Sequence, residues 1–141
     1  NKPFSNKGER VLLSDTRKGV LVVYCGLDEH QVYLAALAEL QGDDRLLGEL
    51  LAYPACCVDY FLDKFSLENP DPVLSGSVEE NITVDSWMLD ISKRKDDITL
   101  ISHFPCSWVC ERSLEIAKNR LSLLQRDLPN RALEIEKFLL S

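Results

Sequence analysis

The sequence lacks the usual features of a membrane or secreted protein. None of its apolar runs approaches the roughly 18 residues needed to cross a bilayer, and the longest, residues 20–25, has the length of a strand. The first eight residues lack the apolar core of a signal peptide, and an initiator Met is also missing. We therefore expect a cytoplasmic protein that does not enter a membrane, trimmed or cut from a longer chain.

A positive charge balance is also missing. Acidic residues number 23 against 16 basic ones, which gives a formal net charge of −7. Phosphate backbones and anionic lipid surfaces repel such a chain, so neither nucleic acid nor a membrane is expected as its main partner. The basic clusters at 17–18 and 93–95 are interpreted as solvated turns. The remaining partner classes are a protein or a small-molecule substrate.

An even number of cysteines is missing as well. The 141 residues contain five cysteines, and no secretion signal accompanies them. A disulfide framework is therefore not predicted, and reduced thiols are the better expectation. In a reducing compartment, clustered cysteines indicate metal binding or redox chemistry.

Hydrophobic patterning predicts an α+β fold. Three short runs rich in apolar and β-branched residues, 10–13, 20–25 and 98–102, are expected to form a small three-stranded sheet. About five to six helices should pack on it, with residues 1–9 as a flexible lead-in and 10–141 as a single domain. Helices are expected over residues 28–42, 43–51, 54–65, 84–92, 105–127 and from 129 onward. The segment 66–83 is predicted to be a loop.

Four of the five cysteines lie in two similar segments, Tyr53-Pro54-Ala55-Cys56-Cys57 and His103-Phe104-Pro105-Cys106-Ser107-Trp108-Val109-Cys110. Each segment places an aromatic residue and a proline ahead of cysteine, and each is predicted to begin a helix. The unpaired N–H groups and partial positive charge of a helix start favour thiolate over thiol. The fifth cysteine, Cys25, is assigned to the core.

A cysteine-ligated metal site is the first hypothesis. Cys106 and Cys110 are four residues apart, so on a helix they share one face with Cβ atoms about 6 Å apart. Cys56 and Cys57 are adjacent, which does not match the spacing usual for zinc. The four thiolates fit an iron–sulfur cluster or Zn²⁺, with His103 as a substitute ligand or behind the ligands. Such a module would act in redox chemistry or within a larger enzyme.

Two alternatives remain open. The chain is a thiol-based enzyme or redox protein if Cys106 is a nucleophile of low pKa, His103 its base, and Cys110 or Cys57 a resolving thiol. It is a non-catalytic protein-interaction domain if the cysteines are merely buried. The carboxylates of Asp59 and Asp63 share a helix face and are interpreted as solvated.

Residues 47–61 and 103–114 together resemble a family of small prokaryotic proteins known as a domain of unknown function. The family features are Gly-Tyr-Pro-x-Cys-Cys and His-x-Pro-Cys-x-x-x-Cys, and the resemblance covers the central and C-terminal two-thirds of the chain. This chain has Ala52 where the family tends to have Gly. The resemblance implies that His103 and the cysteines at 56, 57, 106 and 110 form one site, and it supplies no reaction.

Overall fold

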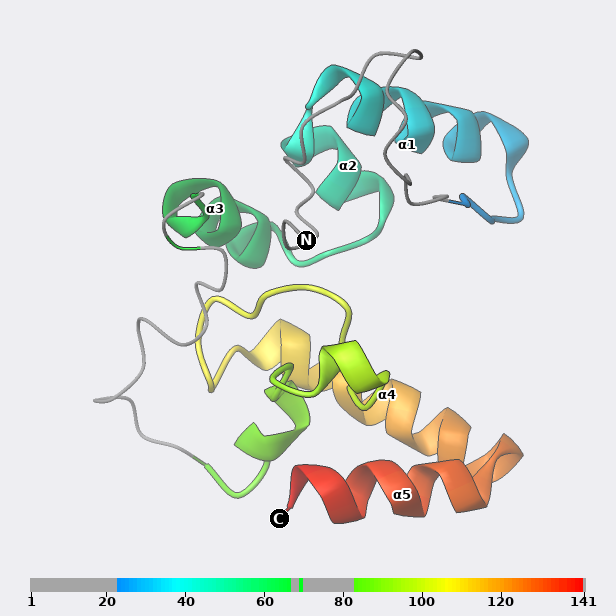
Figure 1. Ribbon diagram of the computed structural model, residues 1–141, viewed down its shortest axis with the longest axis vertical. Helices are drawn as coiled ribbons and strands as arrows, with labels where there is room; N and C mark the ends of the chain where they lie inside the picture. Colours follow the sequence, from blue (N-terminus) through cyan, green and yellow to red (C-terminus); the bar gives the residue numbers. More distant parts are fainter. Residues whose placement is uncertain (1–22, 67–68, 70–82, 141) are drawn as a thin grey trace, which may run out of the picture. The chain divides into compact units, whose positions relative to one another are not determined.

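The computed structural model describes residues 23–66, 69 and 83–140 (Figure 1). These residues belong to two compact units, one ending at Tyr53 and the other beginning at Pro54. The first unit holds α1 (Glu29–Gln41) and α2 (Asp44–Leu50). The second unit holds α3 (Ala55–Lys64), the 3₁₀ helices η2 (Ser86–Leu89) and η3 (Arg94–Asp96), α4 (Glu111–Asp127) and α5 (Pro129–Leu139). The lead-in predicted over residues 1–9 lies outside the described residues, and a single domain over 10–141 stays a prediction.

The predicted α+β fold is wrong, because the described residues are helical and contain no strand. Of the expected sheet, residues 10–13 and 20–22 lie outside the described residues, and 23–25 belong to no helix or strand. Residues 98–102 supply core side chains from an irregular segment in which Leu100 and Ile101 are each 1% exposed. The carbonyl of Leu100 accepts a hydrogen bond from the side chain of Arg120 on α4, so a helix takes the place of a partner strand.

The two helices of the first unit begin and end as the sequence predicts. The carboxylate of Asp28 accepts a hydrogen bond from the N–H of Gln31 at 3.1 Å, and Gly42 ends α1 with a φ of 73°. Asp43 caps α2 in the same way. The core of this unit consists of a small cluster of buried side chains from α1 and α2, namely Ala35, Ala38 and Leu47.

The second unit is built around the helical hairpin of α4 and α5 (Figure 1). Pro129 cannot donate the N–H that would continue α4, and its fixed φ suits the first residue of α5. The short helix expected over 84–92 is the 3₁₀ turn η2, which packs on α4 and buries Leu89 completely. The core extends to Cys57 and Cys110, so the predicted site residues are continuous with the hydrophobic interior.

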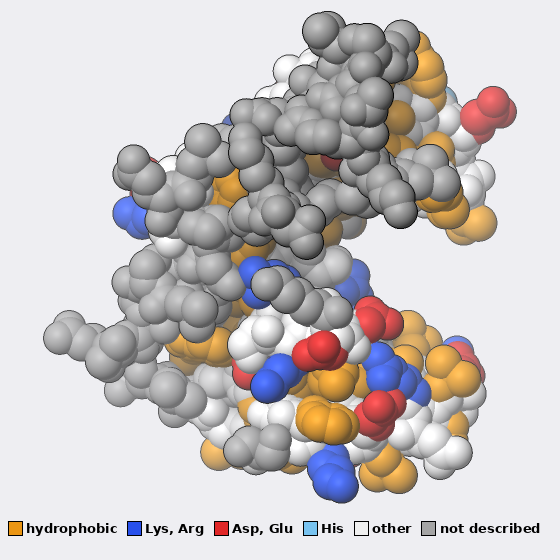
Figure 2. All heavy atoms as spheres, viewed as in Figure 1, with side chains coloured by type: hydrophobic (Ala, Val, Ile, Leu, Met, Phe, Trp, Pro, Cys, Tyr) orange, Lys and Arg blue, Asp and Glu red, His pale blue; other side chains and the backbone are white. Residues whose placement is uncertain are grey.

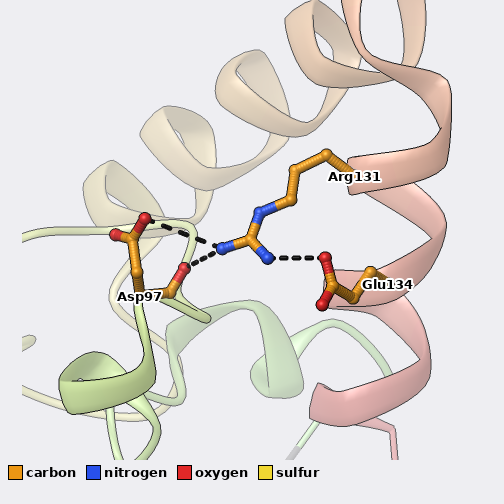
Figure 3. A network of polar contacts seen from close by, with 3 residues as sticks. All are labelled: Asp97, Arg131 and Glu134. Atoms are coloured by element: carbon orange, nitrogen blue, oxygen red, sulfur yellow. Dashed lines mark hydrogen bonds and ion pairs between the residues drawn. The ribbon is translucent and has the colours of Figure 1, made fainter.

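Arg131 ties α5 to the end of η3 (Figure 3). Its guanidinium donates to the backbone carbonyl of Asp97 and lies 3.7 Å from the carboxylate of the same residue, while its other branch lies 2.6 Å from Glu134. Asp97 adopts a left-handed conformation with φ of 59°. This network fixes the turn that precedes the buried side chains of Ile98, Leu100 and Ile101.

Charges of both signs are interspersed on the face of the second unit that Figure 2 shows. Several of them pair at the surface, as Lys118 does with Asp85 at 2.6 Å. Exposed pairs of this kind contribute about 0–1 kcal/mol each, so the stability of the unit rests on its buried core. Within the described part of the chain, every helix is too short or too polar to cross a bilayer.

Candidate metal centre

The start of α3 presents two cysteines side by side. Pro54 is the N-cap residue, so α3 begins one residue later than the sequence predicted, and the carbonyl of Pro54 accepts a hydrogen bond from the N–H of Cys57 at 2.8 Å. Cys56 and Cys57 are therefore the second and third residues of the helix. The first turn of a helix leaves N–H groups without intrahelical partners, which favours negative charge on sulfur atoms placed there.

The second cysteine pair lies in a turn rather than on a helix, which corrects the predicted helix start at Pro105. The N–H of Cys110 bonds to the carbonyl of Ser107, and the hydroxyl of Ser107 accepts the N–H of Val109, both at 3.3 Å. Such local bonds compete with helix formation. α4 consequently begins at Glu111 with Cys110 as its N-cap, so Cys106 lies before the helix and shares no helix face with Cys110.

Aromatic and cationic side chains hold α3 close to the segment 103–110. The rings of Phe61 on α3 and Phe104 stack with centroids 5.6 Å apart, and Phe61 also stacks on Phe65. The guanidinium of Arg94 lies 5.5 Å from the centroid of the Phe104 ring. Stacking and cation–π contacts of this kind contribute about 1 kcal/mol each. The contact between Phe61 and Phe104 joins α3 to a residue 43 positions later in the chain.

The four predicted cysteines meet in one cluster. The Sγ of Cys57 lies 3.7 Å from that of Cys110, and the Sγ of Cys56 lies 3.9 Å and 3.8 Å from those two. All four sulfurs, including that of Cys106, lie within 4.8 Å of one another. Cys57 and Cys110 are buried, Cys106 is partly buried, and Cys56 is exposed.

These separations match the geometry of one tetrahedral ion. With Zn–S bonds of about 2.3 Å, the sulfurs of a tetrahedral site lie about 3.8 Å apart, because the edge of a tetrahedron is about 1.6 times its centre-to-corner distance. In a [4Fe–4S] cluster each thiolate binds a different iron, so the sulfurs stand farther apart than around a single ion. The four cysteines can therefore hold a metal ion, and the spacing of the sulfurs of Cys56, Cys57 and Cys110 is that expected around one ion.

Two hydrogen-bonding groups lie beside the buried sulfur of Cys57. The backbone N–H of Cys106 donates to the Sγ of Cys57 at 3.4 Å, and the hydroxyl of Ser113 lies 3.3 Å from the same sulfur. The Oγ of Ser113 also lies 2.8 Å from the Nε2 of His103. Ser113 is fully buried in the first turn of α4, and His103 is 5% exposed. His103 thus reaches the cluster through Ser113, and its predicted role as base or ligand stays a prediction.

Ser113 was not among the site residues predicted from the sequence. Its signal is its position three residues after Cys110, where the third helical residue faces the N-cap. Because the helix was expected to begin at Pro105, Ser113 was placed in its third turn and attracted no attention. The correct helix start would have pointed to it.

The pKa values of three thiols in the cluster are shifted in different directions. Burial raises the pKa of Cys57 to about 12, although hydrogen bonds from Ser113 and Cys106 oppose the shift. Burial, and then repulsion from Cys57, also raise the pKa of Cys106. Burial acts against ionisation of Cys110 too, but Ser113 and the neighbouring thiols outweigh it and lower its pKa to about 7. Metal binding at neutral pH must therefore displace protons from Cys57 and Cys106.

Three other residues singled out in the sequence, Cys25, Asp59 and Asp63, are exposed. Cys25, expected in the core, is exposed in the first unit. Asp59 and Asp63 are exposed on α3, and Asp63 pairs with Lys64 at 2.8 Å, in agreement with their interpretation as solvated carboxylates. Burial, and then the positive charge of Arg120, lower the pKa of His103 to about 4, so its imidazole is neutral at pH 7.

Comparison with known proteins leads to relatives without an assigned activity. The model of a family described as a protein of unknown function (DUF483) matches residues 15–140. An uncharacterized protein of Methanothermobacter thermautotrophicus is 33% identical over 101 residues, which cover 71% of this chain and 50% of the relative. The chain thus spans about half the length of that curated relative. None of the solved structures matches significantly.

Proposed function

The chain belongs to the DUF483 family of proteins of unknown function, and because membership brings no activity with it, we propose a function from its own side chains. It binds one Zn²⁺ ion through the thiolates of Cys56, Cys57, Cys106 and Cys110. The ion serves as a structural clamp. The observation that carries this proposal is the separation of 3.7–3.9 Å among three of the sulfurs, which equals the edge of a tetrahedral zinc site.

The composition of the cluster favours a structural role over a catalytic one. Catalytic zinc sites keep a position open for water or substrate, whereas four cysteine ligands close the coordination sphere. The ligands come from the start of α3 and from the turn that leads into α4, so one ion joins two separate segments of the second unit. The N–H of Cys106 and the hydroxyl of Ser113 then stabilise the charge on Cys57.

The thiol-enzyme alternative has weaker support. A nucleophilic cysteine needs a depressed pKa, and burial raises the pKa of Cys106. The hydrogen bond defined for the Nε2 of His103 runs to Ser113, a neutral hydroxyl. The cysteine with a lowered pKa is Cys110, which is 7% exposed and therefore poorly reachable for a substrate.

Metal analysis of the purified chain tests the proposal. We expect one zinc per chain in the wild-type protein and in Cys25→Ser, the matched control that removes an exposed cysteine outside the cluster. We expect Cys57→Ser to lose most of its zinc, since it removes a buried ligand. Wild-type protein purified without metal, or with several irons and sulfide, would reject the zinc proposal.

A further inference from the structure

The four sulfurs of the cluster differ sharply in their access to solvent. Cys57 and Cys110 are only 2% and 7% exposed, and Cys106 is partly buried. Cys56, in the first turn of α3, is alone among them in being exposed. A reagent that approaches the centre from solution therefore meets the Sγ of Cys56 first.

The sulfurs also differ in their hydrogen bonds. Cys57 has two donors beside it, the N–H of Cys106 and the hydroxyl of Ser113. In the described part of the chain, the only hydrogen-bonding neighbours of the Cys56 sulfur are other cysteine sulfurs, such as those of Cys57 and Cys110. Hydrogen bonds to a thiolate withdraw its charge and reduce its nucleophilicity. Once a metal has removed the thiol protons, Cys56 therefore keeps more available lone pairs than Cys57, and its exposure distinguishes it from the partly buried Cys106.

We propose that Cys56 is the modification site of this centre, the sulfur that soft electrophiles and two-electron oxidants attack, with Cys110 as the resolving sulfur that closes a disulfide and releases the metal. This inference rests on the proposed zinc site. The ligands are all cysteines but differ in role: Cys57 holds the ion, and Cys56 is the sulfur that is oxidised.

Cys110 is the better placed of the two nearby partners. Its Sγ lies 3.8 Å from that of Cys56 and belongs to a segment 54 residues away. Cys57 is almost as near, at 3.9 Å, but adjacent side chains on a helix diverge by about 100°. A disulfide between neighbours would therefore distort the first turn of α3, whereas one to Cys110 links two segments that already meet.

With hydrogen peroxide as the oxidant, the chemistry balances. The Cys56 thiolate attacks one peroxide oxygen, the O–O bond breaks, and a sulfenic acid forms while hydroxide leaves. The Cys110 thiolate then attacks the sulfur of Cys56, and a second hydroxide leaves as the S–S bond forms. Peroxide gains two electrons, and each sulfur loses one. The ion loses two of its four ligands, so it is released.

The test uses the zinc-loaded wild-type chain and begins with its zinc content. One equivalent of N-ethylmaleimide is added, and peptide mass spectrometry locates the label, with the exposed Cys25 as the internal reference for a free thiol. We expect labelling of Cys56 to exceed that of the other three ligands at least about tenfold. Hydrogen peroxide should then release zinc, as reported by a chromogenic chelator, together with a disulfide between Cys56 and Cys110.

A matched pair of variants at saturating zinc extends the test. Cys56→Ser and Cys106→Ser each remove one ligand, but only the first removes the reactive sulfur. We expect peroxide to release zinc at least about tenfold more slowly from Cys56→Ser than from Cys106→Ser. Labelling that favours Cys106 or is spread evenly would overturn the inference and leave the zinc site intact. A wild-type chain without zinc would overturn the proposed function and this inference together.

Discussion

Substitution of Ser113 by Ala should weaken both the fold and the metal site. The Oγ of Ser113 lies 3.3 Å from the Sγ of Cys57 and 2.8 Å from the Nε2 of His103. Its hydroxyl has one hydrogen, so it can donate to only one of these two atoms at a time. When the hydroxyl donates to the Cys57 thiolate, the ring N–H of neutral His103 must donate to the Ser113 oxygen. The three groups then form a chain, and removal of the middle member takes one hydrogen bond from the Nε2 of His103 and one from Cys57, which keeps the N–H of Cys106.

The expected loss can be estimated from that geometry. A buried donor left without an acceptor costs about 1–3 kcal/mol, and Ser113 is 0% exposed, so water does not replace its hydroxyl without rearrangement. Loss of a hydrogen bond behind a metal ligand lowers metal affinity by about 10–100-fold. We therefore expect Ser113→Ala to lower the free energy of unfolding by about 1–3 kcal/mol and zinc affinity by about 10–100-fold.

Urea unfolding and competition with a chromophoric chelator measure the two effects. Ser122→Ala is the matched control, because Ser122 lies on the same helix but is exposed, and its hydroxyl donates to the carbonyl of Lys118 one turn earlier. That control should change the free energy of unfolding by less than about 0.5 kcal/mol and leave zinc affinity unchanged. Equal effects of the two substitutions would refute the hydrogen-bonded chain from His103 to Cys57.

Three further substitutions test the packing of the core, the turn after α2 and the buried histidine. Leu89→Ala should lower the free energy of unfolding by about 2–5 kcal/mol, because Leu89 is fully buried; thermal unfolding measures it. Ala52→Gly should stabilise the chain by about 0.5–1 kcal/mol in the same assay, since Ala52, which follows the C-cap of α2, has a φ of 56°. Burial, and then the charge of Arg120, lower the pKa of His103 from 6.5 to about 4, so the unfolded chain binds the extra proton as the pH falls between these values. Stability should fall with pH in that window by up to about 1.4 kcal/mol per unit, and His103→Asn should flatten the slope seen in urea titrations.

The cysteine cluster was the part of the site that the sequence could predict. Two proline-led segments carried four thiols, and a family resemblance grouped them, so their meeting did not depend on the helix boundaries. The detailed geometry did depend on them. Ser107 forms local hydrogen bonds that delay the start of α4 to Glu111, and this shift hid Ser113 and removed the expected helix face shared by Cys106 and Cys110.

The predicted sheet failed because apolar content indicates burial more reliably than it indicates pairing. Residues 98–101 have the composition of a buried strand, and Ile98, Leu100 and Ile101 are indeed buried. Their backbone, however, is satisfied in other ways: the N–H of Ile98 bonds to the carbonyl of Lys93, and the carbonyl of Leu100 bonds to Arg120. An arginine on a distant helix cannot be recognised as the substitute for a strand in the sequence alone.

X-ray absorption at the zinc edge of the purified, zinc-loaded chain tests the central claim most directly. A site made by Cys56, Cys57, Cys106 and Cys110 predicts four sulfur scatterers at about 2.3 Å and no lighter ligand. Nitrogen or oxygen atoms in the first coordination sphere, or fewer than four sulfurs, would contradict the assignment of these four cysteines to one tetrahedral ion.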